Sequence, residues 1–77
     1  MKLTQAEQKL LSQLEFATKS ETVTNPNSKE SVFLEPRAVA LYDFIIGCEL
    51  FRMHKEVVMA KELFRKLYPT EYMILLD

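Results

Sequence analysis

The chain has 77 residues, of which 48% are hydrophobic and 27% are charged, and its formal net charge is −1. A chain of this size can bury only one small hydrophobic core, so we expect a single domain over residues 1–77. Ten basic residues stand against eleven acidic residues. This balance excludes a uniformly basic surface that would hold nucleic acid by counterion release.

The residues that usually carry cofactors and metals are scarce. One glycine, Gly47, is too few for a phosphate-binding loop or a dinucleotide fingerprint. One cysteine and one histidine are too few for a zinc site. We therefore expect no cofactor and no metal. Because Cys48 cannot form an internal disulfide and no apolar run approaches 18 residues, we expect a cytoplasmic protein that does not bind a membrane.

Only Cys48 and His54 could form a nucleophile and base pair. On one continuous helix their side chains would point about 120° apart, so they could meet only if the chain turned between them. Cys48 stands in the apolar run Phe44-Ile45-Ile46-Gly47-Cys48, which is typical of a buried thiol. We expect no catalytic residues and no enzyme activity.

The first helix is predicted over residues 5–18. Thr4 and Glu7 have the spacing of a capping box, which starts a helix at Gln5. Apolar residues then follow one helical stripe: Leu3, Ala6, Leu10, Leu14 and Ala17. Phe16 lies off this stripe, and we expect the following loop to cover it.

Residues 19–34 are predicted to be a polar loop. The segment Asn25-Pro26-Asn27-Ser28 is turn chemistry, and short strand-like segments stand on either side of it, at residues 22–24 and 31–34. A short β-hairpin is therefore the alternative for this region, although an isolated two-stranded ribbon is only marginally stable in water.

A second helix is predicted over residues 36–50, with Pro36 as its first residue. Its apolar side chains cover almost the whole circumference, which indicates a central, buried helix. Its end stays open between Gly47 and His54. A third helix is expected over residues 55–68 and, after Pro69, a short fourth helix over residues 71–76 with Thr70 as its cap.

These elements predict an all-α fold, a small bundle of three to four helices. We expect Ile45 and Phe64 to be deeply buried in its core.

Two features of the sequence suggest a function. The first is a surplus of apolar residues beyond the core stripes, which favours a protein interface or a homodimer at Phe51, Val58 and Met59. The second is a basic segment over residues 52–66, where five cationic residues stand against two acidic ones. As an alternative function, a helix-turn-helix with its turn at Gly47 would use this segment to contact DNA through a set of four residues: Arg52, Lys55, Lys61 and Arg65.

The second half of the chain, at residues 41–45, 60–65 and 68–77, resembles small uncharacterised helical proteins of tailed phages and prophages. The resemblance implies an accessory protein that acts by contact with a protein, and it brings no activity, cofactor or catalytic residue. We therefore expect a non-catalytic protein-interaction module whose partner is another protein or a second copy of the chain. A small DNA-binding regulator is the alternative.

Overall fold

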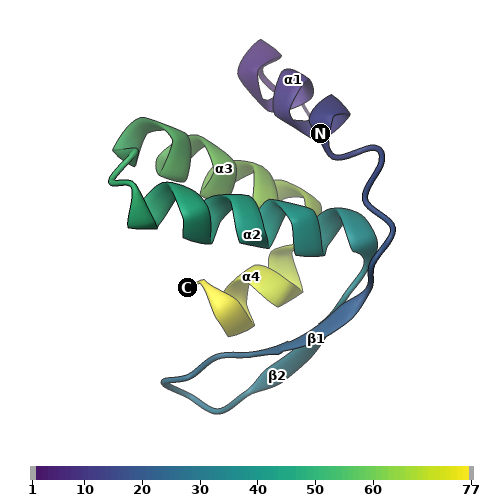
Figure 1. Ribbon diagram of the computed structural model, residues 1–77, viewed down its shortest axis with the longest axis vertical. Helices are drawn as coiled ribbons and strands as arrows, with labels where there is room; N and C mark the ends of the chain where they lie inside the picture. The colour runs from purple at the N-terminus through teal and green to yellow at the C-terminus, as the bar shows by residue number, and fades with distance from the viewer. Residues whose placement is uncertain (1, 77) are drawn as a thin grey trace.

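The computed structural model describes residues 2–76, so the two terminal residues of the expected 1–77 domain lie outside it. A β-hairpin follows the first of four helices (Figure 1). In chain order the elements are α1 Gln5–Gln13, β1 Glu21–Thr24, β2 Ser31–Leu34, α2 Pro36–Leu50, α3 His54–Leu67 and α4 Pro69–Leu75. The fold is mostly helical, as predicted, but the two-stranded sheet means that it is not purely all-α.

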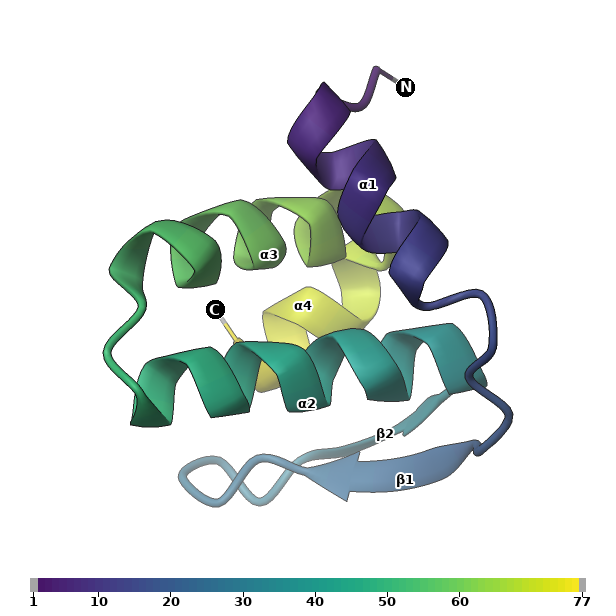
Figure 2. The same ribbon diagram turned by 45° about the horizontal axis from the view of Figure 1, so that its top comes forward.

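Helix α1 begins as predicted but ends early. The Thr4 hydroxyl accepts the Glu7 amide at 3.1 Å, and the Glu7 carboxylate accepts the Thr4 amide at 2.8 Å, which completes the capping box. The prediction of a helix to residue 18 is wrong, because the amides of Leu14 and Ala17 bond to carbonyls three residues back and tighten the chain into a turn. Phe16 is 87% exposed, so the expected cover is also wrong. The segment after α1 runs on to β1 (Figure 2).

The polar region after α1 forms the alternative hairpin, not only a loop. Its strands pair antiparallel with Val23 opposite Val32, and Leu34 at the end of β2 is buried while Phe33 beside it is exposed. The turn is held by Asn25, whose side chain accepts the Asn27 amide at 2.9 Å and donates to the Ile74 carbonyl of α4, also at 2.9 Å. The ribbon is stable here because it packs against α2 and α4.

Helices α2 and α3 lie side by side and run in opposite directions (Figures 1 and 2). Helix α2 starts at Pro36 and ends at Leu50, within the interval that the sequence left open. Gly47 lies inside α2, so the turn that the DNA-binding alternative places there is wrong. The chain turns at Arg52 instead, in the left-handed conformation with φ 57°.

The turn after α2 is a Schellman motif. The Met53 amide bonds to the Cys48 carbonyl at 2.9 Å, and the Arg52 amide bonds to the Glu49 carbonyl at 3.1 Å. These two bonds satisfy carbonyls that the end of a helix leaves without partners. Helix α2 therefore ends at a defined residue, although the left-handed position of the motif is Arg52 and not the glycine that is usual there.

The last two helices start slightly earlier than predicted. Helix α3 occupies His54–Leu67 instead of residues 55–68, and α4 occupies Pro69–Leu75 instead of residues 71–76. Pro69 is the first helical residue of α4, as Pro36 is in α2, so Thr70 is inside the helix and does not cap it.

The core lies between α2 and α3. Helix α1 packs on α3, and α4 packs on α3 and β2 (Figure 2). Ile45 and Phe64 are fully buried, which confirms the prediction for both. The buried apolar residues are Leu10, Leu14, Leu34, Ala38, Val39, Leu41, Ile45, Cys48, Val57, Ala60, Leu63, Phe64 and Leu75.

Candidate functional site

Exposed apolar side chains concentrate at the turn between α2 and α3. Within residues 2–76, eight large apolar side chains are exposed, and five of them lie between positions 46 and 58: Ile46, Leu50, Phe51, Met53 and Val58. Leu50 and Phe51 are 78% and 80% exposed. We call Leu50, Phe51 and Met53 the tip patch. Exposed apolar groups of this kind are candidates for a protein-binding surface.

A shallow groove opens between α1 and the α2–α3 pair. It consists of two hollows of about 230 and 260 Å³ that share Ala6 and Met59. We call them together the α1–α3 groove. Its lining residues are Ala6, Lys9, Leu10 and Gln13 of α1, Phe44 of α2, and Lys55, Glu56 and Met59 of α3.

Phe51 of the tip patch and Phe44 of the groove point in nearly the same direction from α2. Phe44 and Phe51 are seven residues apart, so their side chains leave α2 within about 20° of each other. Phe51 keeps this geometry, because its amide still bonds to the Gly47 carbonyl at 3.1 Å. Phe51 therefore lies on the same side of α2 as Phe44, about two helical turns further along.

The three predicted interface residues are not all in this surface. Phe51 is exposed at the tip, and Met59 is half-buried, packs against the core and lines the groove. Val58 points about 100° away from Met59 around α3, and it is 69% exposed on the outward face of that helix. Met59 thus lines the groove, Phe51 lies at the tip, and Val58 faces away from the groove.

The sequence did not identify the residues of α1 as part of a site. Ala6 belongs to the apolar stripe predicted for the first helix, yet it is exposed, as is Lys9. Their role as lining depends on where α1 crosses α3, and no local pattern in the sequence fixes that position. The small side chain of Ala6 is the one local signal, because it leaves the space that a larger residue would fill.

Of the four cations in the DNA-binding alternative, two form ion pairs with carboxylates and two do not. Lys61 pairs with Glu49 at 3.8 Å, and Arg65 donates to Glu62 from its Nε at 3.2 Å. This bond to Arg65 lowers the pKa of the Glu62 carboxyl. Arg52 and Lys55 are exposed and form no ion pair within residues 2–76.

The arrangement of α2 and α3 also differs from a DNA-reading motif. A helix-turn-helix crosses its two helices at about 90–120°. Here they are antiparallel neighbours (Figure 2), and the Lys61–Glu49 pair bridges them. The helices of this pair are therefore not splayed in the way that lets a second helix enter the major groove.

Cys48 and His54 lie in different environments. Cys48 is buried in the core, where desolvation first and the charge of Glu56 second raise the pKa of its thiol. His54 is exposed at the start of α3, and no hydrogen bond joins it to Cys48 in the described part of the chain. A buried thiol with a raised pKa is a poor nucleophile at neutral pH.

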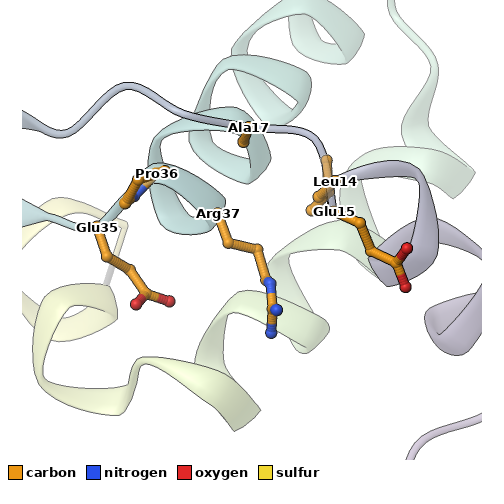
Figure 3. Close-up of a pocket in the computed structure, with 6 residues that line it drawn as sticks. All are labelled: Leu14, Glu15, Ala17, Glu35, Pro36 and Arg37. Carbon is orange, nitrogen blue, oxygen red and sulfur yellow. The ribbon is translucent and has the colours of Figure 1, made fainter.

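A third hollow, of about 230 Å³, lies where α2 begins (Figure 3). It is lined by Leu14, Glu15, Ala17, Glu35, Pro36 and Arg37. Figure 3 shows the Arg37 side chain between the two carboxylates, and none of these three residues forms an ion pair within residues 2–76. The Tyr68 hydroxyl donates to Glu35, and burial together with this bond raises the pKa of Tyr68. This contact ties the start of α4 to the start of α2.

Within residues 2–76, no three His, Cys, Asp or Glu side chains are placed to hold a metal ion together. None of the helices in this described part is both long and apolar enough to span a bilayer. Comparison with protein-family models, curated proteins and solved structures finds no match to this chain.

Proposed function

We propose that this chain is a small non-catalytic protein-interaction module, of the kind found as accessory proteins in phages, that binds a protein through the tip patch and the α1–α3 groove. One observation supports the proposal above the others. Three of the eight exposed large apolar side chains in the described chain, Leu50, Phe51 and Met53, lie at the one turn between α2 and α3, and a groove between the helices is lined by Phe44 and Met59. Covering these side chains would remove apolar area from water and drive binding.

The residue types suit binding. Phe51 offers a large contact area and has only two side-chain torsions to immobilise. Met53 and Met59 are flexible and polarisable, so they can adapt their shape to a partner. A rigid aromatic anchor flanked by adaptable side chains is typical of a contact that a few residues dominate.

Chromatography with light scattering tests whether the partner is a second copy. A dimer that Phe51→Lys converts to a monomer would assign the tip patch to self-association. Phe16→Lys is the matched control, because Phe16 is as exposed as Phe51 but lies after α1. A monomeric wild type would exclude self-association, so the proposal would then require a different protein as the partner.

A salt-dependent titration with duplex DNA tests the alternative of a DNA-binding regulator. Phosphate contacts release counterions, so binding through α3 would weaken steeply with salt and disappear in the Lys61→Glu, Arg65→Glu variant. We expect no such binding, since both cations already pair with carboxylates. Sequence-selective binding that this variant abolishes would overturn the proposed function.

A further inference from the structure

We infer that the α1–α3 groove accepts an acidic amphipathic helix of a partner protein, with apolar side chains on Phe44 and Met59 and carboxylates facing Lys9 and Lys55. The inference rests on the proposed function and adds the chemistry of the partner.

The shape of the groove fits the apolar face of a helix. Its two hollows, of about 230 and 260 Å³, adjoin at Ala6 and Met59. Side chains four residues apart on a helix are neighbours about 6 Å apart along its axis, so one face can fill two adjoining hollows. The exposed Phe51 lies on the same side of α2 as Phe44, about two turns closer to the tip.

The charges around the groove select an acidic partner. Lys9 and Lys55 line it, are exposed, and form no ion pair within residues 2–76. Arg52, at the tip, is also exposed and without an ion pair in that part of the chain. The one acidic lining residue, Glu56, is half-buried. Carboxylates on the partner would meet these cations and speed its association.

Two other occupants fit less well. A bilayer surface is flat, whereas the groove floor is recessed, with Leu10 buried and Phe44 and Met59 half-buried. A second copy would have to place a different face in the groove, and such head-to-tail contacts form rings or open chains instead of a closed dimer.

The test uses the full chain, labelled with ¹⁵N, and three synthetic helical peptides with the same leucine spacing but with Glu, Gln or Lys at the flanking positions. We expect the Glu peptide to bind about tenfold more tightly than the Lys peptide at low salt, since two partly exposed charge pairs supply about that factor. The difference should shrink as salt is added. Chemical-shift changes should centre on Ala6, Phe44 and Met59.

Charge reversal provides the control. Lys9→Glu with Lys55→Glu should reverse the order of the peptides. Lys19→Glu with Lys29→Glu makes the same change in net charge at two exposed lysines that do not line the groove, so this variant should keep the wild-type order. Circular dichroism verifies that both variants stay helical.

The other outcomes are distinguishable. Equal binding of the three peptides, or a preference for Lys, would overturn the acidic partner and leave the apolar docking surface standing. If no peptide binds and the wild type is monomeric, both the inference and the proposed function fail. If phosphatidylserine vesicles compete with the Glu peptide for the groove, the inference is overturned in favour of a lipid surface. If the protein forms oligomers of increasing size and Leu50→Lys prevents this, the inference is overturned in favour of a second copy of the chain.

Discussion

The ammonium group of Lys66 lies 2.8 Å from the carboxylate of Glu7, so the last turn of α3 is bonded to the first turn of α1. The Glu7 side chain is almost completely buried, and the same oxygen accepts the Thr4 amide. One carboxylate therefore both closes the cap of α1 and fastens this helix to α3.

We expect Lys66→Met to lower the free energy of unfolding by about 3 kcal/mol, because it leaves the buried Glu7 charge without its partner. Urea denaturation followed by circular dichroism measures the loss. Lys9→Met is the control: Lys9 has no ion pair within residues 2–76, so its replacement should change stability by less than about 0.5 kcal/mol. Equal effects of the two variants would contradict the role of the pair.

Stability should also fall in acid. The hydrogen bond from Lys66, and then the bond from the Thr4 amide, hold the pKa of Glu7 below its ordinary value of 4.5. A carboxylate with a depressed pKa contributes stability that is complete above its unfolded pKa and is lost as the pH falls through the folded pKa. The contribution of Glu7 to the urea midpoint should therefore be constant from pH 7 down to about pH 5 and should then decline towards pH 2.

Glu7→Gln separates this effect from other carboxylates. The amide keeps the shape of the side chain but does not titrate, so the variant should lose less stability between pH 5 and pH 2 than the wild type does. Parallel curves for the two proteins would show that Glu7 does not carry the acid sensitivity.

Gly47→Ala should stabilise the protein. Gly47 lies inside α2, and a Cβ added there meets nothing within 4 Å. Alanine is better than glycine in a helix interior by about 1 kcal/mol, partly because it restricts the unfolded chain. In a domain of this size that corresponds to a rise in melting temperature of about 4–8 °C, which calorimetry can measure. A lower melting temperature would mean that the space at Gly47 is needed.

Arg52→Gly should stabilise the turn by about 1 kcal/mol, because the left-handed conformation of Arg52 strains any residue with a Cβ. Arg52→Ala is the matched control, since it removes the same side chain and keeps the strain. Only the glycine variant should raise the urea midpoint. If both variants behave alike, the guanidinium and not the backbone governs stability at this turn.

The sequence predicted the parts of the fold that depend on neighbouring residues. The capping box at Thr4 and the helix start at Pro36 follow from local hydrogen bonding and fixed backbone geometry, and the stripe of α3 identified Phe64 as core. The end of α1 could not be predicted in this way, because residues 14–18 continue the helical stripe and only the path to β1 interrupts it. The hairpin depended likewise on its packing against α4.

The candidate site was predicted less completely. Excess apolar character identified Phe51 and Met59, but it could not show that Val58 faces outward while Met59 lines a groove. The burial of Glu7 could not be predicted from the neighbouring residues either, since a charged residue in the first turn of a helix is normally solvated. Its partner stands 59 positions later in the sequence.

The hydrogen bond from Asn25 to the Ile74 carbonyl reaches 49 positions along the chain, and the bond from Lys66 to Glu7 reaches 59. Both segments are thus held by partners that stand later in the sequence. During synthesis α1 cannot dock before α3 has formed and the hairpin turn cannot bond before α4 has formed, whereas α2 and α3 can pair as soon as both have emerged. The order of synthesis and the order of folding are therefore opposed, and α1 and the hairpin should stay open to chaperones and proteases until α3 and α4, respectively, have formed.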